Sequence, residues 1–154
     1  MRTCFVFLSV VLLVACQRDT VQEAVLVPGA SMGPVRLGAT RADLAALGLS
    51  VGGDPSGQAG DQASYAGPFT LIFDAAEHVE SVAVDLSRLS RGLHFASSTL
   101  AQSTTYEEAI AALAPCDPPR PYVGGTSTTC QGGGVHVERS SVQHAPLRIR
   151  VLKK

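Results

Sequence analysis

Four residues near the N-terminus, Leu13-Val14-Ala15-Cys16, constrain the fold most strongly, because they indicate where the folded part of the chain begins. The basic Arg2 precedes an apolar run from Phe5 to Val14, and the small Ala15 lies directly before the cysteine. This order of charged, apolar and small residues is typical of an export signal. The run is shorter than the roughly 20 apolar residues that a membrane-spanning helix requires. We therefore expect residues 1–15 to be a signal peptide.

This segment resembles the signal peptides of bacterial lipoproteins, in which four residues ending in cysteine form the lipobox. The resemblance implies cleavage before Cys16, transfer of a diacylglycerol to its thiol, and acylation of its amine, for example with palmitate. Several acyl chains make a stable anchor, because each buried CH₂ contributes roughly 0.8 kcal/mol. By the same resemblance, Gln17 in place of an aspartate implies lipid anchoring in the bacterial outer membrane, with the domain facing the periplasm. The alternative is an ordinary secretory signal in which Cys16 has no special role.

The remaining chain divides into a tether and one folded domain. Residues 16–28 are expected to form the acylated N-terminus and tether, because Gln17 to Ala24 is polar and has no period. Within this range, Val25–Val27 has the composition of a short strand. Turn-forming residues follow immediately. We expect the folded domain to occupy residues 29–154.

The first half of the domain contains one short predicted helix. Thr40 and Asp43 have the spacing of a capping box, which predicts a helix over about residues 41–47. Leu44 and Leu47 lie three residues apart and are expected to share its buried face. A glycine-rich loop is then expected from residue 50 to residue 64.

The second half repeats this pattern. Thr105 and Glu108 form a second capping box, which predicts a helix over about residues 106–114. Alternating apolar residues predict strands in both halves, at about 65–74, 79–86, 127–130, 134–138 and 147–152. The predicted fold class is therefore α+β: two α-β-β repeats, about 29–90 and 91–154, with short helices packed on an antiparallel sheet. The segment 93–95 is either an additional strand or a hydrophobic plug.

The first unit resembles the repeat of BamE/OmlA-type outer-membrane lipoproteins, and tandem units resemble β-lactamase-inhibitor-protein-like domains. The resemblance implies a binding or assembly role, with helices on one face of a sheet and the other face free for a partner. The residues that carry it are Val35, Leu37, Gly38, Thr40, Leu44, Leu47 and Gly48, with an echo from Leu100 to Leu113.

The cysteines predict a disulfide. Cleavage removes one of the four, acylation occupies Cys16, and Cys116 and Cys130 remain as a pair. In an oxidising periplasm such a pair favours a disulfide, whose closed loop of about 15 residues stabilises a fold by about 3 kcal/mol. A disulfide from a helix end to the next strand is also similar to the inhibitor-like domains. The alternative is a metal site that joins both cysteines to His136 and His144.

Composition gives few indications of function. With 12 basic and 13 acidic residues the chain has no basic cluster of the kind that binds nucleic acid. No Gly-x-Ser-x-Gly motif marks a nucleophilic serine. We therefore predict no enzymatic activity, cofactor or metal. Aromatic residues are scarce, and the residues available for a protein interface are Tyr65, Tyr122, Arg120, Arg148 and Arg150.

The prediction is a non-catalytic envelope lipoprotein that reaches the membrane through Cys16 and binds or scaffolds another envelope protein. The first alternative is an inhibitor or binding protein for a secreted enzyme, which uses the sheet face and the 117–129 loop. The second alternative is a small envelope hydrolase, in which a serine, a histidine and an acid would have to meet in a deep pocket.

Overall fold

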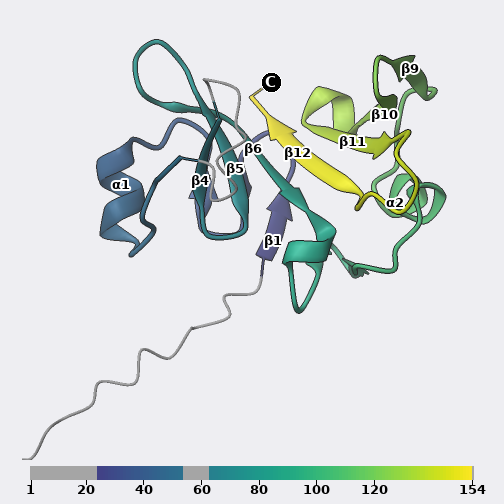
Figure 1. The fold of residues 1–154 in the computed structure, drawn as a ribbon, viewed down its shortest axis with the longest axis horizontal. Helices are drawn as coiled ribbons and strands as arrows, with labels where there is room; N and C mark the ends of the chain where they lie inside the picture. Colours follow the sequence, from purple (N-terminus) through teal and green to yellow (C-terminus); the bar gives the residue numbers. More distant parts are fainter. Residues whose placement is uncertain (1–23, 54–62, 154) are drawn as a thin grey trace, which may run out of the picture.

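The computed structural model describes residues 24–53 and 63–153 (Figure 1). The predicted signal peptide, Cys16 and most of the predicted glycine-rich loop lie outside these residues. The protein is mostly β, because strands make up 45% of the described residues and helices 16%. The predicted α+β class of two α-β-β repeats is therefore wrong. The strands form one sheet of five and one of seven, and both sheets contain strands from both halves of the chain.

The five-stranded sheet has the order β3-β2-β1-β7-β8. Its central β1 and β7 are parallel, with Ala24 opposite Leu93 and Val25 opposite His94. The pairing of β1 means that residues 24–27, expected in the tether, belong to a sheet. The bounds of these strands are β1 Ala24–Val27, β2 Ser31–Met32, β3 Val35–Arg36, β7 Leu93–Phe95 and β8 Ser98–Leu100.

The seven-stranded sheet is antiparallel throughout and has the order β4-β5-β6-β12-β11-β10-β9. Pairing of β6 with β12 joins a three-stranded meander from the first half to a four-stranded one from the second. The predicted strands are found here with shifted ends, and β4 and β9 are additional. The bounds are β4 Ala63–Ala66, β5 Phe69–Phe73, β6 Val79–Asp85, β9 Arg120–Tyr122, β10 Gly125–Cys130, β11 Val135–Ser140 and β12 Arg148–Leu152.

Both predicted helices are present and begin at the predicted capping boxes. α1 (Arg41–Ala46) begins after Thr40, and α2 (Tyr106–Ala112) begins after Thr105. In both cases the threonine hydroxyl accepts a hydrogen bond from the third helical N–H, and the acid at that position accepts one from the threonine N–H. Two 3₁₀ turns, η1 (Leu86–Arg88) and η2 (Gln131–Gly133), complete the helical residues. None of the described helices is long and apolar enough to cross a membrane.

A single hydrophobic core contains residues from both sheets and both helices. α1 contributes only Leu44, and Leu47 is 57% exposed, so the prediction that both leucines share a buried face is wrong. One face of the seven-stranded sheet packs on this core, and we call the other face the open face. Ser81 and Ala83 lie on the open face but are buried among the neighbouring strands. Ala83 lies between Thr70 and Arg150 in the sheet, and Ser81 lies between Ile72 and Leu152.

Candidate functional site

The open face carries a row of charged residues across three neighbouring strands. Asp85 on β6, Arg148 on β12 and Glu138 on β11 are direct ladder neighbours. Arg148 Nε donates to Asp85 Oδ1 at 2.7 Å, and Arg148 Nη2 donates to Asp85 Oδ2 at 3.2 Å. Arg150 Nε lies 3.4 Å from Glu138 Oε1, an ion pair without the alignment of a hydrogen bond. We call these four residues the ion-pair ladder.

Opposite charges in the ladder compensate each other. The hydrogen bonds to Asp85 raise the pKa of Arg148 above its ordinary value, although partial burial opposes this shift. Asp85 therefore accepts two hydrogen bonds from Arg148, whereas Glu138 is held beside Arg150 by an ion pair alone.

His136 adds a titratable group beside the ladder. Its Nε2 lies 3.3 Å from the Thr129 hydroxyl oxygen, on the strand next to its own. Burial lowers the pKa of His136, while Glu138 raises it and Arg150 lowers it further. The imidazole is therefore harder to protonate than an exposed histidine.

A cleft of about 290 Å³ opens above one end of the ladder. Its lining includes Asp85, Glu138 and Arg148, with Tyr122 from the end of β9 and Pro146 from the segment between β11 and β12. Charged groups and an aromatic ring therefore meet in one concave site, a combination suited to recognition of a polar ligand or protein side chain.

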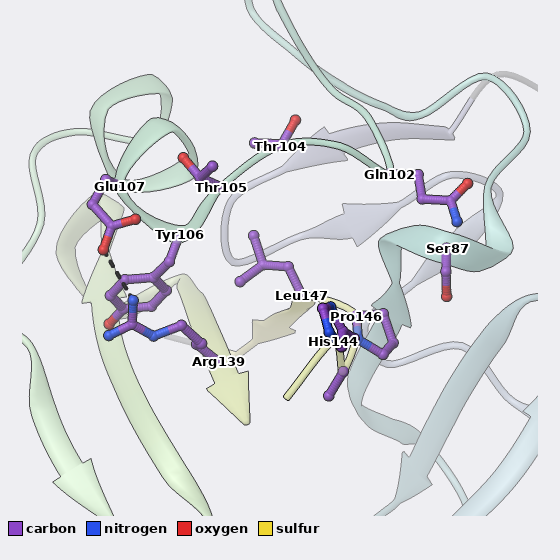
Figure 2. Close-up of a pocket in the computed structure, with 11 residues that line it drawn as sticks. Ser87, Gln102, Thr104, Thr105, Tyr106, Glu107, Arg139, His144, Pro146 and Leu147 are labelled. Carbon is purple, nitrogen blue, oxygen red and sulfur yellow. Dashed lines mark hydrogen bonds and ion pairs between the residues drawn. The ribbon is translucent and has the colours of Figure 1, made fainter. Parts of the chain in front are cut away.

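A second cleft, of about 440 Å³, lies against α2 and shares Ala145 and Pro146 with the first. Figure 2 shows Glu107, Tyr106 and Arg139 together on one side of this cleft. Arg139 Nη1 donates to Glu107 Oε1 at 3.0 Å, and its guanidinium carbon lies 4.7 Å from the centroid of the Tyr106 ring. These contacts fix the arginine over the ring in a partly exposed ion pair.

Tyr106 itself is buried. Burial raises the pKa of its phenol, and the neighbouring Thr128 and Arg139 oppose the shift. The Tyr106 side chain belongs to the hydrophobic core, and its phenol is harder to deprotonate than that of an exposed tyrosine.

An exposed apolar patch lies beside the two clefts. Tyr122 is 46% exposed, Val123 101% and Val142 69%. The two segments that carry them are joined, because the N–H and hydroxyl of Ser141 both donate to Gly124 O, at 2.7 and 3.1 Å. We call Tyr122, Val123 and Val142 the distal patch. In Figure 1, β9 and β10 lie at the end of the molecule opposite α1.

The structure contains the disulfide expected between Cys116 and Cys130, with an S–S distance of 2.02 Å. It connects the segment after α2 to the end of β10. Both sulfur atoms are bonded to each other, so neither cysteine is available as a thiolate ligand. The alternative metal site with His136 and His144 therefore does not form. The two histidines contribute to different surfaces, the open face and the second cleft.

Within residues 24–53 and 63–153, no group of three or more His, Cys, Asp or Glu side chains is placed to hold a metal ion. Of the interface residues that the sequence suggested, Tyr122 and Arg148 meet at the first cleft. Arg120 lies on β9, the strand that also carries Tyr122, and Arg150 lies on β12 in the ion-pair ladder. Tyr65 is instead on β4, near Arg88.

Val142 and Val123 are not among the interface residues that the sequence suggested. Each is an isolated valine in a segment of turn-forming residues, where apolar residues do not recur at the spacing of a strand or a helix. The signal that could have found them is the β10–β11 pairing, because Gly125 opposite Ser140 brings the turn before β10 next to the chain after β11.

No protein-family model, curated protein or solved structure matches this chain. The resemblances to lipobox signals, BamE/OmlA-type lipoproteins and inhibitor-like domains stay predictions. The function is therefore proposed from the described residues and from the N-terminal sequence.

Proposed function

We propose that the protein is a non-catalytic envelope lipoprotein, held in the outer membrane by an acylated Cys16, which binds another envelope protein. Its binding surface consists of the distal patch and the adjoining ion-pair ladder. No nucleic acid or cofactor takes part.

The distal patch is the observation that carries this proposal. Six large hydrophobic residues are exposed among the described residues, and three of them gather where two loops are joined by hydrogen bonds. Exposed apolar groups that cluster beside polar groups are characteristic of protein interfaces, whereas isolated ones are ordinary. Tyrosine is also among the residues that most often dominate binding energy.

The ladder supplies the polar part of the same surface. Tyr122 lines a cleft together with Asp85, Glu138 and Arg148. Arg120 lies two residues before Tyr122 on β9 and is exposed. An apolar centre with fixed charges around it gives a partner both affinity and a defined orientation.

The absence of catalysis is part of the proposal, and the contacts of the polar groups on the open face support it. Asp85 and Glu138 form ion pairs with arginines, and the Nε2 atom of His136 lies 3.3 Å from the Thr129 hydroxyl. A general acid or base needs a titratable group free to exchange a proton with a substrate.

Site-specific crosslinking in living cells tests the proposal. A photoreactive amino acid replaces Val123 in the full-length protein, and the matched control replaces Leu47, which is also exposed but lies at α1. We expect a discrete crosslinked species of higher mass for position 123 and none for position 47. Equal labelling at both positions, or none at either, would contradict the proposed surface.

The alternative function, inhibition of a secreted enzyme, would use the same protruding β9–β10 hairpin. Fully exposed Val123 at its turn is the kind of residue that enters a partner's cleft. The crosslinked protein distinguishes the two: an enzyme that loses activity upon binding supports inhibition, and a structural envelope protein supports scaffolding.

A further inference from the structure

We propose that the segment Leu86–Gly92 is a membrane-facing surface that contacts the anionic phospholipid headgroups of the membrane in which Cys16 is anchored. This inference rests on the proposed acylation of Cys16. It adds to the distal patch a second surface with a different partner.

The parallel pairing of β1 and β7 carries the geometric part of the inference. The two strands begin side by side, with Ala24 opposite Leu93. Parallel neighbours start at the same edge of a sheet, so the chain that arrives at Ala24 and the segment that ends at Gly92 reach the sheet from the same end. Ala24 and Gly92 also line one recess of about 200 Å³.

The length of chain before β1 keeps this end near the lipid. Eight peptide units separate Cys16 from Ala24, and a fully extended chain of that length spans at most about 28 Å. Figure 1 shows the turn that follows β6, which contains η1, close to the beginning of β1, whereas β9 and β10 lie at the upper right. Leu86–Gly92 therefore lies at the end of the domain to which the anchor is attached, and the β9–β10 end lies farther from that attachment point.

The chemistry of the segment fits an anionic surface. Its sequence contains two consecutive copies of Leu-Ser-Arg, and it has no acidic residue. Arg88 and Arg91 are both exposed, and Leu89 is half-buried between them. Arginines near an anionic membrane are attracted to its phosphates, and the effect falls off within a Debye length.

The segment is also held in one shape. Leu86 is buried, and its N–H donates to Leu147 O at 2.9 Å. The N–H of Leu89 donates to Leu86 O at 3.2 Å, and that of Gly92 donates to Leu89 O at 3.3 Å. The guanidinium group of Arg88 lies 5.6 Å from the centroid of the Tyr65 ring. A fixed turn presents its charges without the ordering cost that a disordered segment would incur.

A fluorescent probe on this segment tests the inference. Ser90→Cys is labelled in the acylated full-length protein with an environment-sensitive dye, and the control is Val123→Cys, in the exposed turn between β9 and β10. Both proteins are inserted into phosphatidylcholine vesicles with or without phosphatidylglycerol. We expect anionic vesicles to shield the dye at position 90, but not at position 123, from a neutral aqueous quencher.

Charge reversal supplies the second measurement. In the protein labelled at position 90, Arg88→Glu and Arg91→Glu should each reduce the ratio of shielded to unshielded protein by more than about fivefold, because loss of one arginine charge accounts for about that factor and the added carboxylate is repelled by the anionic surface. Arg120→Glu, at the other end of the molecule, should leave it unchanged. High salt should reproduce the effect of the reversals. Circular dichroism establishes that each variant is folded.

Failure of this inference and failure of the proposed anchoring are distinguishable. If mass spectrometry finds no acyl chain on Cys16, the anchoring is wrong and this inference falls with it. If Cys16 is acylated but the dye at position 90 is equally accessible in neutral and anionic vesicles, only the headgroup contact is overturned.

Discussion

Arg148 and Asp85 join the two halves of the chain by two hydrogen bonds across β12 and β6, with Nε–Oδ1 and Nη2–Oδ2 distances of 2.7 and 3.2 Å. The residues are 63 positions apart in sequence and are direct ladder neighbours. Their pairing lies where the meander β4-β5-β6 meets the strands β9–β12. It also forms part of the lining of the cleft beside the distal patch.

Replacement of either partner should destabilise the protein. Hydrogen bonds to charged groups contribute about 1.5–3 kcal/mol, and the partial exposure of both side chains reduces this, so a double-mutant cycle of Asp85→Ala and Arg148→Ala should give a coupling of about 1 kcal/mol. Urea denaturation measures it. The more exposed Glu107–Arg139 pair should couple less, and equal coupling of the two pairs would contradict the importance of the junction.

Loss of the disulfide should lower stability substantially. Cys116→Ala with Cys130→Ala removes a crosslink over 14 positions, and the expected decrease in the free energy of unfolding is about 3 kcal/mol. The denaturation midpoint of the oxidised protein, compared with that of the double variant, tests this. An unchanged midpoint would show that the crosslink does not restrict the unfolded chain.

The sequence was sufficient for local features and insufficient for the sheet arrangement. Thr40 and Thr105 predict the helix starts because capping is a contact between residues three positions apart. The alternation around Arg148 and Arg150 predicts β12 because sheet periodicity is also local. The five-stranded sheet depends instead on the pairing of Ala24 with Leu93, which no local pattern specifies.

The same limit applies to the site. Interface candidates such as Tyr122 can be chosen by residue type, but the patch exists only because Ser141 bonds to Gly124. Exposure of Leu47 was also unpredictable from helical spacing, since α1 ends one residue before it and only Leu44 reaches the core.

Gly125→Ala should disrupt the β10–β11 pairing and with it the distal patch. A Cβ at this position would collide with Arg139 O and come within 3.1 Å of Ser140 Cα. Such backbone clashes cost about 1–3 kcal/mol. Gly53→Ala, where no described atom lies within 4 Å of the added Cβ, is the matched control. Thermal denaturation compares the two variants, and equal midpoints would contradict the steric argument.

Acidification should weaken the fold through His136. Burial holds its folded-state pKa below the ordinary 6.5, so the unfolded chain binds the proton more readily. Stability should therefore be complete above about pH 6.5 and decrease as the pH falls from there towards the folded-state pKa. In His136→Gln this part of the pH dependence should disappear. An identical stability profile for the variant and the original protein would show that the histidine is not involved.

Cys16→Ser should release the protein from the membrane and leave its fold intact. Cys16 lies outside the described residues, and the effect is expected because the acyl chains supply the membrane affinity. Fractionation locates the variant protein, and circular dichroism compares its fold with that of the original. A variant that stays in the membrane fraction would contradict anchoring through this residue.

The most direct test of the proposed binding surface is the yield of the crosslink from a photoreactive residue at position 142 in living cells. Tyr122→Ala should reduce this yield, because truncation of a dominant interface tyrosine costs about 2 kcal/mol of binding energy, roughly a thirtyfold change in affinity. Tyr65→Ala, on β4, should leave it unchanged. Equal yields in the original protein and both variants would contradict the claim that the distal patch binds an envelope protein.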